Sequence, residues 1–185
     1  MYYSENKRNK GICLRTIPES YVVVDIETTG LSPVFASIIE ISAKKVYPSK
    51  VEEFSVLINP GRPLPPNITT LTGITDEMLK DKGGIEEAIT SFIAFLGNNV
   101  MVGHNVNFDI NFLYDASIKY LGKALSNDFV DTMVLGRALH PELGHHRLAD
   151  LAQLYGIDYS HAHRALEDCK ITRIVLEHFR NELKD

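Results

Sequence analysis

The sequence predicts an α/β domain in which a mixed β-sheet is flanked by helices, and three observations support this fold class. Three strand-like segments follow one another from Tyr21 to Pro60, before any long helical pattern. Short apolar strands then alternate with amphipathic helical patterns as far as Leu183. The 185 residues are 44% hydrophobic and 23% charged, a composition that suits one globular domain with a sizeable core.

The first half of the predicted domain is a three-stranded meander. Tyr21–Val24 starts a strand that is apolar on both faces, and the segments 37–47 and 51–60 are two further strands. A turn at 47–50 joins these two, so we expect antiparallel pairing throughout. Residues 62–75, rich in proline and threonine, are predicted as a loop with a short helical piece.

The second half alternates helices with short strands. We expect strands at 100–103 and 129–131, and because helices connect them, they should join the sheet in parallel. The predicted helices cover residues 84–96, 105–121, 132–139, 147–155 and 163–183.

Residues 1–20 differ from the rest of the chain. They have no clear period and carry four cations, so we expect a flexible basic arm followed by a single domain over 21–185. The start has no apolar signal segment, and no apolar run approaches the length of a membrane span, so we expect a cytoplasmic protein. Cys13 and Cys169 have no metal-type spacing, and Cys169 is expected to be a reduced core residue.

Acidic side chains stand where apolar ones are expected. Asp25 and Glu27 are two residues apart on the first strand, so they share a face about 7 Å apart. At an effective dielectric near 20 they repel by about 2 kcal/mol. Asp109 lies between Val106 and Leu113 on the apolar side of its helix.

Asp168 likewise lies on the apolar side of its helix, the last one, three residues after Ala165 and four before Thr172. A single acid in such a place can serve as a helix cap, but four from three elements are costly to bury unless they bind metal. Carboxylate oxygens suit Mg²⁺ or Mn²⁺, and two such ions can promote an in-line displacement at phosphorus. The net charge of −5 disfavours a protein that simply coats nucleic acid.

Three motifs resemble those of the DEDDh 3′→5′ exonucleases: "DIETTGL" (25–31), "HNVNFDINFL" (104–113) and "HRALEDC" (163–169). The resemblance extends over residues 21–180 and includes "LTGIT" (71–75) and "DT" (131–132). It implies a ribonuclease H-like fold with a five-stranded mixed sheet. Within the family, the chain is most similar to the proofreading exonucleases of bacterial DNA polymerase III, either the epsilon subunit or the exonuclease domain of the Gram-positive polymerase.

The resemblance also implies a catalytic set. Asp25, Glu27 and Asp168 would hold one divalent ion, and Asp25 with Asp109 the second, as Mg²⁺ or Mn²⁺. His163, five residues before Asp168, would be the general base for the attacking water, and nucleoside 5′-monophosphates would be released.

Substrate contacts follow from the same resemblance. The turn after the first strand would meet the 3′-terminal nucleotide, and the segment 71–75 would pack against the terminal bases, with Ile74 as an apolar wedge. Asn105 and Phe108, which precede Asp109, would line the same cleft. The complete set of expected contacts is Thr28, Thr29, Gly30, Leu31, Leu71, Thr72, Ile74, His104, Asn105 and Phe108.

Other polar residues are assigned structural roles. Glu40 and Asp131 occupy positions that resemble acidic positions of the family outside the catalytic four, and we interpret both as structural. The histidines at 145, 146, 161 and 163 match no standard zinc spacing. His161 could compete for the role of base, but its spacing to Asp168 is seven residues rather than five.

The sequence therefore predicts a 3′→5′ exodeoxyribonuclease related to proofreading or repair. Its expected partners are single-stranded nucleic acid 3′ ends, with DNA preferred, and a DNA polymerase, with no membrane. Two alternatives remain open: an exoribonuclease acting on RNA 3′ ends, and an inactive nucleic-acid-binding module of a polymerase complex. An intact set of four acids and a histidine argues against the inactive module.

Overall fold

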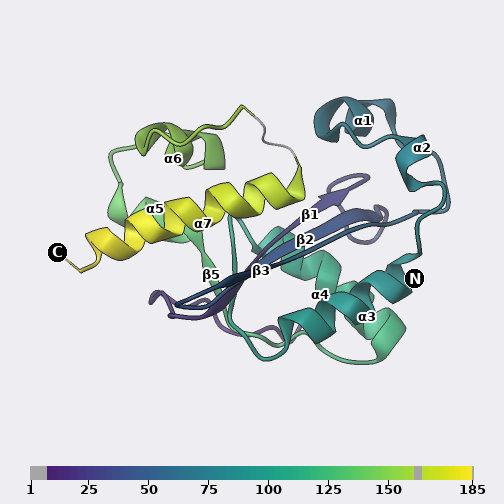
Figure 1. The fold of residues 1–185 in the computed structure, drawn as a ribbon, viewed down its shortest axis with the longest axis horizontal. Coiled ribbons are helices and arrows are strands. Elements are labelled where there is room, and N and C mark those ends of the chain that lie inside the picture. The colour runs from purple at the N-terminus through teal and green to yellow at the C-terminus, as the bar shows by residue number, and fades with distance from the viewer. Residues whose placement is uncertain (1–7, 161–163, 185) are drawn as a thin grey trace.

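The computed structural model describes residues 8–160 and 164–184, and it contains the predicted mixed sheet (Figure 1). The strand order is β3-β2-β1-β4-β5. β1 pairs with β2, and β2 with β3, in antiparallel register, whereas β4 pairs with β1, and β5 with β4, in parallel. The strand bounds are Tyr21–Thr28 for β1, Ile38–Val46 for β2, Val51–Leu57 for β3, Met101–Gly103 for β4 and Phe129–Asp131 for β5.

Helices cover both faces of this sheet (Figure 1). The helix bounds are Pro66–Thr72 for α1, Asp76–Leu79 for α2, Ile85–Leu96 for α3, Asn107–Leu121 for α4, Thr132–Leu139 for α5, Leu148–Leu154 for α6 and Ala165–Glu182 for α7. Helix α2 was not predicted, and α7 begins after the predicted start at residue 163, which lies outside the described residues. Within the described ranges, no helix has both the length and the apolar character needed to cross a bilayer.

Strand β1 lies at the centre of two cores, because its side chains alternate between the two faces. Val22, Val24 and Ile26 pack with α3 and α4, while Tyr21 and Val23 pack with α5, α6 and α7. A third, smaller cluster holds α1 and α2 near β2, and its members are Ile39, Leu64, Ile68, Ile74 and Leu79. The strand that carries the candidate acids is therefore supported from both sides.

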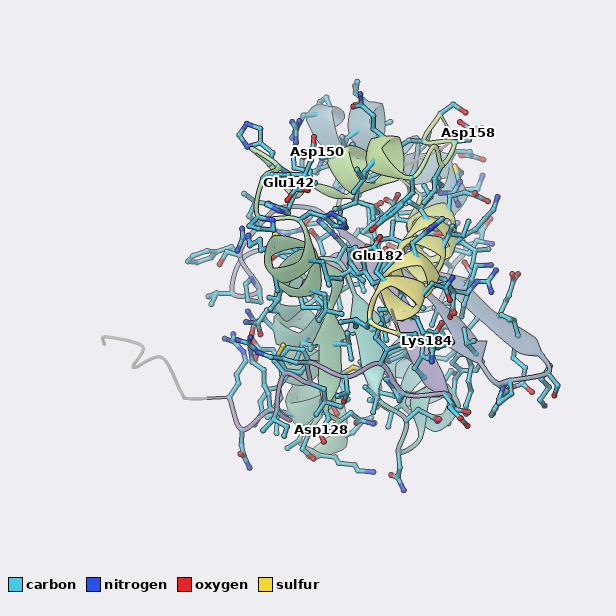
Figure 2. All side chains as sticks on the ribbon, turned by 90° about the vertical axis from the view of Figure 1, so that its left-hand side faces the viewer. Asp128, Glu142, Asp150, Asp158, Glu182 and Lys184 are labelled. Atoms are coloured by element: carbon cyan, nitrogen blue, oxygen red, sulfur yellow. The ribbon has the colours of Figure 1, made fainter. Side chains whose placement is uncertain are left out.

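A hydrogen-bonded network joins the three helices on the α7 side of the sheet. His140 Nε2 lies 2.7 Å from the Tyr155 hydroxyl, which donates to Glu182 Oε1 at 2.6 Å. Figure 2 shows Glu142, Asp150 and Glu182 on this side of the molecule, over α5, α6 and α7. The network fixes α7 relative to α5 and α6, and thereby the helix that carries Asp168.

Residues 8–20, which belong to the arm predicted to be flexible, contact the rest of the domain in the structure. Arg8 forms a two-pronged ion pair with Asp115 on α4, at 2.7 Å, and Cys13 forms a parallel bridge with Phe129 of β5. Leu14 and Ile17 pack against the α7-side core. Sequence periodicity could not reveal these contacts, because each joins residues about a hundred positions apart. Residues 1–7 lie outside the described ranges.

Gly11 makes a close backbone contact that tests this packing. A Cβ placed there would lie 2.2 Å from the carbonyl oxygen of Asn127, a backbone atom that cannot move aside cheaply. We expect Gly11→Ala to lower the free energy of unfolding by about 1–3 kcal/mol, measured by chemical denaturation. Gly144→Ala is the matched control, because an added Cβ there meets nothing within 4 Å. Equal stability of the two variants would show that the segment does not pack in this way.

Candidate active site

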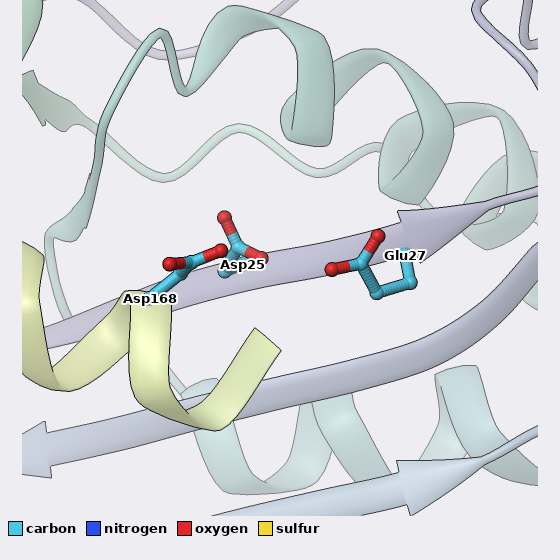
Figure 3. Close-up of side chains that lie close together, drawn as sticks. All are labelled: Asp25, Glu27 and Asp168. Carbon is cyan, nitrogen blue, oxygen red and sulfur yellow. The ribbon is translucent and has the colours of Figure 1, made fainter. Parts of the chain in front are cut away.

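Three carboxylates from two elements meet at the end of β1. Asp25 and Glu27 project from β1 toward the start of α7, where Asp168 points back toward Asp25 (Figure 3). One oxygen from each lies within 4.8 Å of the others. In the part of the chain that the structure describes, no other group of three His, Cys, Asp or Glu side chains comes as close. The shared face predicted for Asp25 and Glu27 is confirmed by their strand pairing.

Asp109 approaches the same strand from α4. It is buried, and its Oδ1 accepts the backbone N–H of Ile26, the residue between Asp25 and Glu27, at 3.0 Å. Helix α4 can start this close to β1 because Gly103 has no side chain: an added Cβ would lie 2.5 Å from Val106 Cγ2. Asp109 thus lies beside the three-carboxylate group, as a separate acid fixed by a backbone hydrogen bond.

The acids raise one another's pKa values. Burial, reinforced by Asp168, Glu40 and Asp109, raises the pKa of Glu27 to about 8, and Arg164 opposes this rise. Burial also raises the pKa of Asp109 to about 8, although backbone N–H groups, including that of Ile26, oppose it.

Asp25 is affected in the same direction. Burial first, and then the charges of Asp109, Asp168 and Glu27, hold its pKa well above the ordinary range. Such a cluster is unfavourable when ionised without a cation, and a hard divalent ion is what its oxygen atoms suit. The residues present therefore fit a divalent metal.

Asp131 and Glu40, which were interpreted as structural from the sequence, lie outside the three-carboxylate group. Asp131 caps α5 by accepting the N–H of Met133 at 2.9 Å, and it also accepts the N–H of Asn105 at 3.0 Å. Asn105 has a positive φ of 54°, so this bond supports the turn that leads into α4. Glu40 is buried on β2 and pairs with Arg164.

The described histidines form no zinc site. The ring of His146 contacts the carbonyl oxygen of His140, and His104 Nδ1 lies 3.0 Å from the Thr132 hydroxyl. None of the described histidines joins a group that could hold a metal. The predicted base, His163, and its competitor, His161, lie outside the described residues.

The turn after β1 is built by its own hydroxyl groups. Thr28 Oγ1 donates to the carbonyl oxygen of Gly30 at 2.7 Å, and Thr29 Oγ1 accepts the N–H of Ser37 at 2.9 Å. Leu31, the last residue of the motif, is 87% exposed at the tip of this turn. The turn therefore presents an apolar side chain to solvent directly beyond the acids.

The predicted wedge, Ile74, does not face solvent in the structure. Its side chain is fully buried in the cluster that holds α1 near β2. Gly73 ends α1 in a left-handed conformation, with φ of 70°, and the chain then turns inward. Thr72 is also buried, and its hydroxyl donates to the carbonyl oxygen of Ile68. Of this segment's predicted contacts, only Leu71, which is 53% exposed, can meet a ligand without rearrangement.

Phe108 and Asn105 flank the start of α4. Phe108 is partly buried and packs against Phe112, with ring centroids 5.0 Å apart, whereas Asn105 is exposed. The substrate-contact role predicted for these two residues stays a prediction.

A hollow beside the turn after β1 was not predicted from the sequence. Arg62 Nη2 donates to the carbonyl oxygen of Phe35 at 2.8 Å, and it contacts the hydroxyls of Ser37 at 3.3 Å and Thr29 at 3.4 Å. Leu31, Phe35 and Arg62 line an open hollow of about 360 Å³, and Phe35 is 79% exposed. The apolar letters of "SPVF" within a turn were the one available signal.

The sequence of this chain is similar to those of known nucleases and polymerases. The sequence profile of the exonuclease family matches residues 22–176. The chain belongs to the exonuclease family. This exonuclease-family chain is 42% identical over 160 residues to the PolC-type DNA polymerase III of Bacillus subtilis, and 42% identical over 153 residues to that of Caldanaerobacter subterraneus. It spans 85% and 82% of its own length in these matches, but only 11% of each polymerase.

Solved structures agree with this assignment. Exonuclease X in complex with 5′ overhanging duplex DNA is 29% identical, with a TM-score of 0.71 over 88% of this chain and 92% of that one. Escherichia coli exonuclease I in complex with a dA16 oligonucleotide shares the fold, at 18% identity and a TM-score of 0.71 over 88% of this chain and 40% of that one. The resemblance to the exonucleases of bacterial DNA polymerase III is confirmed.

Proposed function

We propose that this chain is a metal-dependent 3′→5′ exodeoxyribonuclease of the DEDDh type that releases nucleoside 5′-monophosphates from DNA 3′ ends. The observation that carries the proposal is the meeting of the Asp25, Glu27 and Asp168 carboxylates, within 4.8 Å, in a chain of the exonuclease family. Relatives that are DNA polymerases, and a structural neighbour solved with DNA, support DNA rather than RNA as the substrate.

The acids of this chain would bind two divalent ions. Asp25, Glu27 and Asp168 would hold one, and Asp25 with Asp109 would hold the other, while the Ile26 N–H fixes one oxygen of Asp109. Bound there, such ions supply a nucleophilic water at neutral pH and neutralise charge on the scissile phosphate. The protein's own contribution is to hold four acids in place before substrate arrives, although burial raises the pKa values of three of them, Asp25, Glu27 and Asp109.

His163 is the proposed general base. The proposal rests on its place in the third motif, five residues before Asp168 and directly before Arg164, the N-cap of α7. An imidazole has a pKa near neutrality, so it can accept a proton from the attacking water and return to its neutral form within one turnover.

The hollow beside the turn after β1 is the proposed binding site for the terminal bases of the DNA. Leu31 and Phe35 offer an apolar surface on which any base can stack. Arg62 adds a positive charge that would attract the phosphate backbone of the DNA. We expect Phe35→Ala to raise the KM for single-stranded DNA about 5- to 20-fold with kcat nearly unchanged, since stacking contributes to binding whichever base is present. Steady-state kinetics on an oligonucleotide would measure this.

Val34→Ala is the matched control for Phe35→Ala. Val34 belongs to the same turn and is 62% exposed, but it does not line the hollow. We expect its KM to stay within twofold of the wild-type value. If the two variants behaved alike, the hollow would not be a base site.

The proposed chemistry is tested by digesting 5′-labelled single-stranded DNA and RNA of matched sequence with Mg²⁺, Mn²⁺ or chelator. The wild type should produce a metal-dependent ladder that shortens from the 3′ end, faster on DNA, and Asp109→Ala should not. Faster digestion of RNA would favour the exoribonuclease. Absence of any ladder with folded, metal-loaded protein would contradict the free-standing enzyme and favour a binding module of a polymerase complex, the partner that the PolC-type relatives suggest.

A further inference from the structure

We propose that Arg164 is a positioning residue, which holds the first turn of α7, and with it Asp168, in place through an ion pair with buried Glu40. The inference rests on the proposed function, because it concerns the arrangement of the same carboxylates. Neither residue belongs to the catalytic set predicted from the motifs.

The pair joins two distant parts of the chain at the edge of the site. Arg164 Nε lies 3.3 Å from Glu40 Oε2, and Arg164 Nη2 lies 3.3 Å from Glu40 Oε1, so the guanidinium faces the carboxylate with two nitrogens. The Glu40 side chain is 1% exposed, whereas that of Arg164 is 44% exposed. A buried carboxylate needs such a partner, and this two-pronged arrangement fixes direction as well as charge.

Arg164 also holds the backbone of α7. It is the N-cap residue, and its carbonyl oxygen accepts the N–H groups of Glu167 at 2.9 Å and Asp168 at 3.0 Å. Arg164 therefore binds β2 through its side chain and the first turn of α7 through its backbone. A rotation of this turn would move the Asp168 carboxylate relative to Asp25, whose oxygens lie within 4.8 Å of it.

The strand register places the Arg164–Glu40 ion pair next to the proposed metal ligands. Glu40 on β2 stands directly opposite Glu27 on β1, so both side chains lie on the face covered by α7. Farther along the same face, Lys44 is already paired with Glu53 on β3. If Arg164 were removed, Glu40 would become a further buried acid beside Glu27 and would compete with it for cations.

A direct contact between Arg164 and DNA is the competing interpretation. The arginine borders an open hollow over β3, so its outer surface is accessible. The geometry favours positioning, because two of its nitrogens are directed at Glu40 rather than at solvent.

The test compares Arg164→Gln, Arg164→Lys, Glu40→Gln and the double variant Arg164→Gln/Glu40→Gln. Each variant is assayed for kcat and KM on single-stranded DNA and, without DNA, for the Mn²⁺ concentration that gives half of the full thermal stabilisation. Glu40→Gln keeps the shape of the buried side chain, so it is the variant expected to fold if Arg164→Gln does not.

We expect Arg164→Gln and Glu40→Gln each to lower kcat about 10- to 100-fold, to leave KM within twofold, and to raise the Mn²⁺ midpoint severalfold. The double variant should be no worse than the poorer single variant, because both remove one interaction. Arg164→Lys should recover part of kcat. Lys170→Gln, which removes an exposed cation from the same helix, should match the wild type on all three measures.

Three results would overturn the inference. A raised KM with unchanged kcat and Mn²⁺ midpoint would indicate a direct contact with DNA. A lower melting temperature with unchanged kcat and midpoint would indicate a merely structural pair. Additive losses in the double variant would show that the two residues act separately. A wild type without nuclease activity would instead contradict the proposed function, and the Mn²⁺ midpoints would still test the positioning.

Discussion

Asp25→Asn is expected to abolish cleavage while making the metal-free protein more stable. The variant removes a ligand that the account assigns to both ions, and we expect activity to fall at least about 1,000-fold, in keeping with the loss of a group that stabilises charge in the transition state. The same change removes a buried carboxyl group whose ionisation is opposed by burial and by Asp109, Asp168 and Glu27, so the variant avoids the free-energy cost of ionising it as the pH rises. The melting temperature in chelator should therefore rise.

The two effects are measured on one preparation, by oligonucleotide digestion with Mn²⁺ and by thermal unfolding with chelator. Asp81→Asn is the matched control, because it removes an exposed acid that does not belong to the three-carboxylate group and should change neither value. Residual cleavage within tenfold of the wild-type rate would remove Asp25 from the ligand set. A fall in the melting temperature would show that the carboxylate stabilises the metal-free fold.

The second large effect is a loss of stability of the metal-free protein as the pH rises. Glu27 and Asp109 have pKa values raised to about 8 in the fold, against 4.5 and 3.8 in the unfolded chain. Between about pH 4 and pH 8 the folded state therefore holds protons that the unfolded state has released. The contribution of these two groups to the free energy of unfolding is therefore fully present below pH 4 and is lost as the pH rises toward 8.

Mn²⁺ should reverse this trend, because ligand carboxylates must lose their protons before they bind metal. Chemical denaturation across pH 5 to 8.5, with chelator and with Mn²⁺, measures both slopes. The stabilisation by Mn²⁺ should grow with pH, and Asp109→Asn should flatten the slope seen in chelator. A metal-free protein whose stability is constant over this range would show that these acids are not buried together in solution.

Local periodicity explains which parts of the site could be predicted from sequence. Asp25 and Glu27 share a face because a strand repeats every two residues, and Asp109 and Asp168 were found as acids at the apolar faces of helices. These relations hold within one element, so a short stretch of sequence contains them. The order of strand-like and helical patterns likewise predicted the strands of the sheet and most of the helices. Helix α2 was not predicted, and α7 begins later than predicted.

Contacts between distant segments could not be predicted in this way. Ile74 was proposed as a wedge because residues 71–75 resemble the family segment that packs against the terminal bases, yet its side chain is buried after Gly73 ends α1. Glu40 and Arg164 are 124 residues apart, and only the folded sheet shows that Glu40 stands opposite Glu27. Arg62 likewise reaches the carbonyl oxygen of Phe35 only because the chain after β3 folds back to the turn after β1.

The central claim is that Asp25, Glu27 and Asp168 together bind a divalent cation. A crystal structure with Mn²⁺ and a nucleoside 5′-monophosphate, near pH 8, tests it directly through the anomalous scattering of manganese. We expect an anomalous peak within bonding distance of all three carboxylates, with the phosphate of the nucleotide beside it. Well-ordered carboxylates with no anomalous peak between them, in crystals that hold Mn²⁺ elsewhere, would contradict the account.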